Sequence, residues 1–342
     1  MKFATIEKII NIEPIVGADS IVTSTVLGWQ VVVKKDEFSI GDLCVYIPID
    51  TIVNTQIQCF SFLSEKAGSD GWMKIKPIKL RGCWSEGLVI PLTNLDQTLT
   101  YCEGMDVSEQ LDVQKYEKEN LITPCGYECS NSSKVITFPK HIVSITDEDN
   151  LKSNISVLKE LLGLEMIGTR KQDGSSLTII KRNDEFIVCS RRQLLDNTSV
   201  MYQYVEREKI MERMTAYGQN LAIQGEFCGP KVNGNHMCLS DYQYYVFNIK
   251  NLDTGSYLGY VDIVKMCDEL KLQTVPVVFE HVCDETWTIA KFQAIANEQK
   301  YITPTGKKVP GEGIVVRSKI PVYSKVLRKN LSVKIINQNY KD

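Results

Sequence analysis

Four short motifs follow one another along this chain, and their order constrains its fold more than any other feature. They are Lys171-Gln172-Asp173-Gly174, Gly225-Glu226-Phe227 with Gly229, Glu312-Gly313-Ile314-Val315, and Val333-Lys334. A lone K-x-D-G is weak evidence, because a chain of this length contains one by chance in roughly one case in ten. The ordered set is much harder to obtain by accident, and it indicates one site that is assembled from several strand ends.

Length and composition are those of an ordinary soluble protein with room for two domains. The 342 residues are 43% hydrophobic and 24% charged, and no apolar run approaches the roughly 18 residues that span a bilayer. The first residues turn polar too soon for a signal peptide. Eleven cysteines are an odd number, so at least one is unpaired, and we expect reduced thiols in an intracellular compartment with no membrane association.

The net charge of −3 argues against a protein that coats nucleic acid, because such proteins are usually strongly basic. An enzyme that contacts RNA through local patches remains compatible with it. The three histidines are far apart in the sequence. We therefore expect any functional metal to be a hard cation that carboxylates and phosphates hold.

The N-terminal region reads as short strands separated by turns. The expected strands are Phe3–Glu13, Ile21–Val33, Leu43–Val53 and Met73–Leu92, with turns at Gly17, Gly41-Asp42 and Gly82. Many short strands with little helix predict a small barrel of the OB type. We place this OB-fold RNA-binding domain at residues 1–120 and a linker, rich in turn-forming residues, at 121–135.

A basic segment lies inside this region. Its cations are Lys74, Lys76, Lys79 and Arg81. If the segment is one strand, Lys74 and Lys76 point to the same face, and with Trp72 or Trp84 nearby that face is a candidate surface for RNA phosphates and bases. A solvated strand face without a ligand is the alternative, and the sequence alone favours it.

From residue 136 to 342 the pattern mixes strands and helices, so the fold class is α+β. A hairpin joins Ser176–Ile180 to Phe186–Cys189. The expected helices are Ser199–Tyr217, Val261–Leu270 and Thr288–Asn297, and further strands are Leu221–Phe227, Tyr242–Ile249, Gly313–Arg317 and Leu331–Ile336. We expect antiparallel sheets flanked by helices, with the motifs at the strand ends.

Lys171 is the candidate nucleophile, because a lysine whose pKa is depressed by a nearby cation can attack phosphorus. Asp173, Glu226 and Glu312 are candidate ligands of a divalent ion, directly or through water, and of ribose hydroxyls. The alternative for the two glutamates is an exposed charge in a glycine turn.

Three further residues complete the candidate site. Phe247, in the aromatic strand around Tyr245-Val246-Phe247, offers a ring that can stack on a purine, whereas core packing is the competing interpretation. Lys334 lies between apolar neighbours on a strand and is placed to neutralise a phosphoryl group. Arg191 is a candidate for ribose or phosphate contact, although Arg192 could serve equally.

These motifs resemble those of the covalent nucleotidyltransferases, the polynucleotide ligases and mRNA-capping enzymes. Over nearly its whole length the chain looks like the ATP-dependent RNA ligases with an N-terminal OB domain, the Deinococcus and Naegleria type. The barrel contributes Leu80-Arg81-Gly82 and Ser85-Glu86-Gly87-Leu88, and the domain join contributes Leu111–Glu117. In DNA ligases and capping enzymes the OB domain follows the last lysine motif, whereas here the barrel-like region comes first.

The resemblance implies an RNA ligase that works in three steps. Lys171 attacks ATP to form lysyl-AMP, the AMP moves to an RNA 5′-phosphate, and an RNA 3′-OH then displaces it. Glu226 is implied to bind ribose, Phe247 adenine and Lys334 the α-phosphate, while Asp173 and Glu312 organise Mg²⁺ or Mn²⁺. The implied partners are ATP and RNA, as nicked duplexes or broken ends in RNA repair, and we expect a monomer.

Two positions depart from the family pattern. Asn248 stands where related ligases often have aspartate, and Ile336 stands where a second lysine is common. Arg328 or Lys329 is a candidate replacement for that lysine at the outer phosphates. A capping-type guanylyltransferase and a non-catalytic RNA-binding protein are the alternatives, and the complete motif set disfavours the second.

Overall fold

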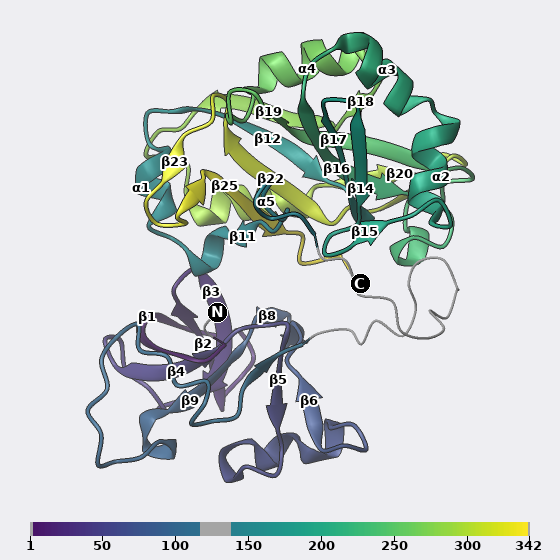
Figure 1. Ribbon diagram of the computed structural model, residues 1–342. Coiled ribbons are helices and arrows are strands. Elements are labelled where there is room, and N and C mark those ends of the chain that lie inside the picture. Colours follow the sequence, from purple (N-terminus) through teal and green to yellow (C-terminus); the bar gives the residue numbers. More distant parts are fainter. Residues whose placement is uncertain (1–2, 117–137, 341–342) are drawn as a thin grey trace. The chain divides into compact units, whose positions relative to one another are not determined.

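The computed structural model describes residues 3–116 and 138–340 of the chain. It divides into two compact units (Figure 1). The N-terminal unit holds residues 1–119 together with 152–155, and the C-terminal unit holds 120–151 and 156–342. The linker that the sequence predicts at 121–135 lies outside the described residues.

The N-terminal unit is built on a curled antiparallel sheet with the order β3-β2-β1-β4-β9. Its strands are β1 (Thr5–Pro14), β2 (Ile21–Val26), β3 (Trp29–Lys34), β4 (Leu43–Ile47) and β9 (Leu88–Pro91). A bulge between Ile9 and Asn11 divides β1, so its first half pairs with β4 and its second half with β2. Because a bulge bends a strand and increases its twist, the sheet curls into an OB-like half-barrel, as the sequence predicts.

Smaller elements complete this unit. They are β5 (Thr51–Asn54), β6 (Trp72–Lys74), β10 (Gln114–Lys115), the hairpin β7 (Ile78–Leu80) and β8 (Cys83–Ser85), and the 3-10 helices η1 (Gln58–Lys66) and η2 (Leu92–Asn94). Three expected strands are each broken into shorter ones. Leu27 and Asp50 have positive φ, which ends β2 and separates β4 from β5, and the run Met73–Leu92 forms β6 to β9.

The C-terminal unit contains two larger sheets. One has the order β11-β25-β22-β12-β19 and comprises β11 (Asp149–Asn150), β12 (Glu165–Lys171), β19 (Val277–Val282), β22 (Gly313–Ser318) and β25 (Ser332–Ile336). The other has the order β15-β14-β13-β16-β17-β18 and comprises β13 (Ser175–Arg182), β14 (Glu185–Cys189), β15 (Leu194–Leu195), β16 (Leu221–Cys228), β17 (Gln243–Asn251) and β18 (Gln273–Thr274). Most pairings are antiparallel, and β11–β25 and β17–β18 are parallel.

Helices pack on these sheets through apolar faces (Figure 1). Helices α2 (Val200–Arg207), α3 (Ile210–Tyr217) and α4 (Tyr260–Glu269) share a core with β13, β16 and β17, and helices α1 (Val157–Leu161) and α5 (Ile289–Asn297) share one with β12, β22 and β25. Short hairpins β20 (Lys300–Ile302) with β21 (Lys308–Pro310) and β23 (Tyr323–Ser324) with β24 (Lys329–Asn330), and the 3-10 helices η3 (Leu151–Ser153) and η4 (Asn233–Asn235), complete the elements.

The predicted helix Ser199–Tyr217 is two helices rather than one. Lys209 adopts the left-handed conformation, with φ 54°, which a continuous α-helix cannot include. Met201 and Met214 are buried in the core that the two helices share with the sheet. The two later helices lie within one residue of their predicted bounds.

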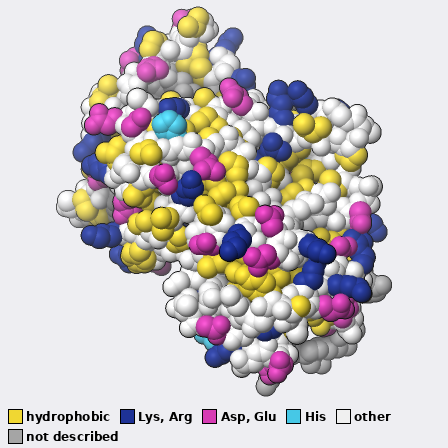
Figure 2. Space-filling model, turned by 90° about the horizontal axis from the view of Figure 1, so that it is seen from above, with side chains coloured by type: hydrophobic (Ala, Val, Ile, Leu, Met, Phe, Trp, Pro, Cys, Tyr) yellow, Lys and Arg dark blue, Asp and Glu magenta, His cyan; other side chains and the backbone are white. Residues whose placement is uncertain are grey.

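One face of the molecule is mixed in charge. In the space-filling view, lysine and arginine side chains are interspersed with aspartate and glutamate around apolar patches (Figure 2). Such a face exerts only a weak long-range field on a polyanion. In the described parts of the chain, no helix is long and apolar enough to cross a membrane.

Candidate active site

The turn between β12 and β13 carries the first motif from one large sheet of the C-terminal unit to the other. Lys171 is the last residue of β12, where it pairs with Gly313 of β22, and Ser175 opens β13. A Cβ on Gly174 would lie 2.3 Å from the carbonyl oxygen of Phe227. Only glycine allows this close approach, so the motif's glycine has a geometric reason at this junction.

Lys171 and Glu312 form an ion pair at the end of the turn. The Lys171 Nζ lies 2.6 Å from Glu312 Oε1, and the side chains are 23% and 18% exposed. Tyr301, which is buried, supports both residues through the backbone. Its hydroxyl donates to the Lys171 carbonyl oxygen at 2.7 Å and accepts from the Glu312 N–H at 3.2 Å. Tyr301 lies outside the four sequence motifs and is not among the predicted site residues.

Three carboxylates surround the Lys171 ammonium. Burial lowers the pKa of Lys171, but Glu312, Glu226 and Asp173 raise it, and their combined effect prevails. Burial raises the pKa of Glu226 to about 8, where attraction to Lys171 opposes repulsion from Glu312 and Asp173. The carboxylates around the ammonium therefore keep Lys171 protonated, and the raised pKa of Glu226 favours its neutral form.

Asp173 is almost completely enclosed, with 2% of its side chain exposed. Its Oδ2 lies 2.6 Å from His236 Nδ1, and its Oδ1 accepts a hydrogen bond from the Asn233 side-chain amide. Both partners come from the Asn- and Gly-rich loop after Gly229. This loop reads as a simple turn in the sequence, so nothing there pointed to a partner for Asp173 60 residues away.

Lys334 comes to the same site on β25, where it pairs with Val315 of β22. Burial and then repulsion from Lys171 lower its pKa, while Asp147 and Glu312 raise it. Lys334 therefore lies within electrostatic range of Lys171 and adds a second cation beside the carboxylates.

Arg191 follows β14 and is exposed. Its Nη2 lies 2.7 Å from Asp147 Oδ2. The segment that contains Asp147 also binds Lys329, which donates to the Asp147 carbonyl oxygen and lies 2.8 Å from Asp149 Oδ2. Lys329, the candidate replacement for the missing second lysine, is thus within reach of the same segment as Arg191.

Phe247 is the unpaired residue of a β-bulge. The register between β16 and β17 shifts here, because Gln224 pairs with Asn248 and Gly225 pairs with Val246. A bulge re-aims a side chain, and Phe247 is only half-buried, whereas Tyr244 is 2% exposed and belongs to the core. The Arg317 guanidinium lies 5.5 Å from the Phe247 ring centre. A pocket lined by both residues does not include Lys171 or the three carboxylates.

The basic segment of the N-terminal unit differs from the prediction. Lys74 and Lys76 do not share a strand face, because β6 ends at Lys74 and Pro77 has no N–H for a ladder. Lys74 pairs with Asp50 at 3.0 Å and lies over the Tyr116 ring. Lys79 of β7 lies 5.6 Å from the Trp84 ring centre, and Arg81 forms the hairpin turn with φ 47°. The four cations thus belong to separate elements.

The composition of the C-terminal site suits a hard divalent cation. Its candidate donors are carboxylate oxygens, which are the ligands that such an ion prefers. Within residues 3–116 and 138–340, no three His, Cys, Asp or Glu side chains already converge as direct metal ligands. The residues that would hold the ion are Asp173, Glu226 and Glu312.

Comparisons with known proteins agree with this arrangement. An OB-fold domain model matches residues 3–92, and an RNA ligase model matches residues 164–336, which is slightly more than half of the chain. The chain belongs to the RNA ligase family, and it is an enzyme of that class. The expected combination of an N-terminal OB domain with a ligase domain is therefore confirmed. No curated protein sequence matches the chain.

Solved structures of Naegleria gruberi RNA ligase are similar over almost the full length. A lysine-to-alanine variant with ATP and Mn is 27% identical and has a TM-score of 0.84, with 98% of this chain and 97% of that chain covered. A structure with PPi has the same identity and coverage and a TM-score of 0.82. An aspartate-to-alanine variant without ligand has a TM-score of 0.83 at 27% identity and covers 98% and 96% of the two chains.

Proposed function

We propose that the protein is an ATP-dependent RNA ligase that seals 3′-OH and 5′-phosphate RNA ends, foremost at nicks in duplexes, through lysyl-AMP. The observation that carries the proposal is the Lys171 Nζ, 2.6 Å from Glu312 in a pocket that three carboxylates and Lys334 share. Support comes from the similar Naegleria structures, which contain ATP, AMP, Mn or PPi.

In the first step the Lys171 amine attacks the α-phosphorus of ATP. A nitrogen–phosphorus bond forms, the bond to the bridging oxygen breaks, and pyrophosphate leaves. The amine must be neutral to attack, whereas the carboxylates hold it protonated in the ligand-free protein. A bound Mg²⁺ or Mn²⁺ would supply positive charge that offsets Asp173, Glu226 and Glu312 and so lowers the pKa of Lys171.

The nucleotide is held by residues around this centre. Phe247 stacks on the adenine, and Glu226 accepts hydrogen bonds from the ribose. Lys334 neutralises charge that develops on the α-phosphate, and Arg191 exchanges Asp147 for a ribose or phosphate contact.

The remaining steps move the AMP and then release it. An oxygen of the RNA 5′-phosphate attacks the lysyl-AMP phosphorus, and Lys171 leaves as the amine. The RNA 3′-OH then attacks the activated 5′-phosphorus, so a phosphodiester forms and AMP departs. The N-terminal unit, with Lys74, Lys76, Lys79 and Arg81, contributes RNA contacts through separate elements.

A sealing assay on matched substrates tests this proposal. The purified protein, ATP and Mn²⁺ are given a 5′-labelled nick in which the 3′-OH strand is RNA, the same nick with DNA, and single-stranded RNA ends. We expect the RNA-containing nick to be sealed fastest. Equal sealing of the DNA nick would contradict the RNA specificity, and faster joining of single strands would contradict the preference for nicks.

A further inference from the structure

We propose that the segment Asn337–Tyr340, which follows strand β25, positions two of the three carboxylates of the site. Asn337 orients Glu312 through its backbone, and Tyr340 orients Asp173 directly and together with His236. The inference rests on the proposed function, because it assigns these residues to the metal and nucleotide centre of the ligase.

Asn337 fixes the backbone on both sides of the Glu312 peptide. It is 1% exposed, its N–H donates to the Glu312 carbonyl oxygen at 2.9 Å, and its Nδ2 donates to the Gly311 carbonyl oxygen at 2.8 Å. The same Nδ2 also reaches the Gln299 carbonyl oxygen at 3.3 Å. Since two consecutive carbonyls are held, the direction in which the Glu312 side chain leaves the backbone is set by Asn337.

Tyr340 acts on the other carboxylate directly, because its hydroxyl hydrogen-bonds Asp173, and His236 contacts both groups. The Tyr340 hydroxyl lies 2.6 Å from His236 Nδ1, and the two rings meet edge to face with centres 5.4 Å apart. The same Nδ1 lies 2.6 Å from Asp173 Oδ2. The Tyr340 ring packs beside Tyr301, whose hydroxyl joins Lys171 to Glu312. Tyr340 and Tyr301 therefore belong to one apolar cluster.

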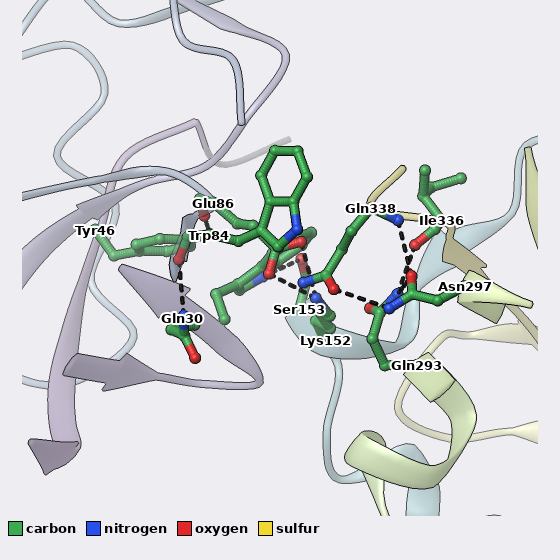
Figure 3. Close-up of polar contacts among 11 residues, drawn as sticks. Gln30, Tyr46, Trp84, Glu86, Lys152, Ser153, Gln293, Asn297, Ile336 and Gln338 are labelled. Carbon is green, nitrogen blue, oxygen red and sulfur yellow. Dashed lines mark hydrogen bonds and ion pairs between the residues drawn. The ribbon is translucent and has the colours of Figure 1, made fainter. Parts of the chain in front are cut away.

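Helix α5 anchors the segment so that it can serve as a fixed support. Gln293 donates to the Ile336 carbonyl oxygen at 2.9 Å, and Asn297 exchanges hydrogen bonds with Gln338 (Figure 3). Lys334 lies only three residues before Asn337 on the same chain segment. The second lysine and the orientation of two carboxylates thus depend on one short, anchored stretch.

The orientation of Asp173 and Glu312 must be fixed, because these carboxylates repel one another in a buried pocket. Like charges move apart unless hydrogen bonds hold them, and ligands of a metal need their orientation fixed by a surrounding set of partners. Removing the Tyr340 hydroxyl while keeping its ring isolates this effect from packing.

Mn²⁺ binding without turnover provides the test. In a Lys171→Met background with ATP, free Mn²⁺ is measured by electron paramagnetic resonance for Tyr340→Phe, His236→Leu and His236→Asn. Tyr323→Phe, an exposed tyrosine of β23, is the matched control. We expect Tyr340→Phe and His236→Leu to weaken Mn²⁺ binding about tenfold. His236→Asn keeps a donor near the Nδ1 position and should retain most of the affinity.

Unchanged Mn²⁺ affinity in Tyr340→Phe, at an unchanged melting temperature, would overturn the inference. Equal losses in His236→Asn and His236→Leu would overturn the positioning role of His236, because rescue would have failed. A protein with Lys171 intact that forms no lysyl-AMP would instead refute the proposed function, so the two failures are distinguishable.

Discussion

Two lysine–glutamate ion pairs in this protein have the same residue types but differ in burial and in surroundings. In the N-terminal unit, Lys152 Nζ lies 2.9 and 2.7 Å from the two oxygens of Glu86, and the side chains are 6% and 7% exposed. In the C-terminal unit, Lys171 contacts one oxygen of Glu312, and the two side chains are about three times as exposed. The Lys152–Glu86 pair is enclosed by the protein and is called the sealed pair below, whereas the Lys171–Glu312 pair is accessible to a ligand.

The surroundings of the sealed pair explain its character. The Lys152 Nζ lies 5.1 Å from the Trp29 ring centre, and the Trp29 indole N–H donates to Ser153 Oγ at 3.1 Å. Glu86 is fixed by its carbonyl oxygen, which accepts from the Tyr46 hydroxyl at 2.9 Å (Figure 3). Buried charge that is matched one to one and enclosed in this way has a structural role.

The pKa values of Lys152 and Lys171 shift in opposite directions, which reflects the same difference between the two pairs. Burial lowers the pKa of Lys152, with Glu86 opposing it, whereas three carboxylates raise that of Lys171 against the effect of burial. A balanced pair needs no further ion. A lysine that several carboxylates share, with access to solvent, lies where a cation and a nucleotide can enter, and this distinguishes the reactive lysine from the structural one.

The largest expected effect is the loss of the reactive lysine. Lys171→Met should slow the sealing of an unactivated 5′-phosphate nick at least about 10⁴-fold, because the nucleophile is gone. Sealing of a pre-adenylylated nick should persist, and the melting temperature should change little. A rate close to that of the unsubstituted protein on the unactivated nick would mean that another residue is the nucleophile.

The sealed pair should respond in stability instead. Lys152→Met leaves Glu86 buried without its partner and is expected to lower the free energy of unfolding by about 3–5 kcal/mol. The double variant Lys152→Met/Glu86→Gln removes both charges and should recover most of that loss. Denaturant titrations with intrinsic tryptophan fluorescence measure both. If the single variant costs nothing, the pair is not the structural element described.

Removing one carboxylate tests the effect of the carboxylates on the pKa of Lys171. Glu312→Gln should slow lysyl-AMP formation about 10- to 100-fold at a fixed, limiting Mn²⁺ concentration. The rate of lysyl-AMP formation should increase with pH as Lys171 loses its proton. In Glu312→Gln this increase should occur at lower pH, because fewer negative charges hold Lys171 protonated. A single-turnover pH series compares the two proteins. A rise that moves to higher pH would contradict the electrostatic account.

The smallest effect is a difference in the pH dependence of stability. Lys152 has a lowered pKa, so the unfolded chain binds more protons between that pKa and the ordinary value of about 10.4, and stability rises with pH there. Lys171 has a raised pKa, so its contribution is present below about 10.4 and is lost as pH rises through the folded value.

Unfolding free energies between pH 8 and 11 should therefore change in opposite senses in two variants. In the unsubstituted protein, Lys152 contributes a free energy of unfolding that increases with pH, and Lys171 contributes one that decreases with pH. The double variant at Lys152 and Glu86 should lose the first contribution, and Lys171→Met should lose the second. Each component is at most about 1.4 kcal/mol per pH unit for one proton. If both contributions changed with pH in the same direction, the proposed difference between the two lysine–glutamate pairs would be wrong.

The sequence predicted those parts of the site that short motifs encode. Lys171, Glu226, Glu312 and Lys334 were identified because glycine spacing and strand patterns mark them locally, and the structure brings them together. Asn233, His236 and Asn337 were missed, since their importance depends on partners that are distant in the sequence. The Lys152–Glu86 pair was missed for the same reason, as 66 residues separate its members.

The fold shows the same division. Fold class and the later helices followed from hydrophobic periodicity, because burial of one face fixes that pattern. Single residues with positive φ, such as Lys209 and Asp50, broke predicted elements, and Pro77 ended the supposed basic strand. Lysine and aspartate carry no strong local signal for such a conformation, so the hydrophobic pattern predicted one continuous element across each of them.

A label-transfer experiment tests the central claim most directly. The purified protein is incubated with Mn²⁺ and α-labelled ATP or GTP, denatured and separated on a gel, with Lys171→Met alongside. The account predicts label from ATP that stays on the protein and is absent from the variant. Label from GTP alone would assign the protein to capping chemistry. No adduct, from protein free of bound AMP and across several divalent metals, would contradict the view that Lys171 is the reactive member of the two pairs.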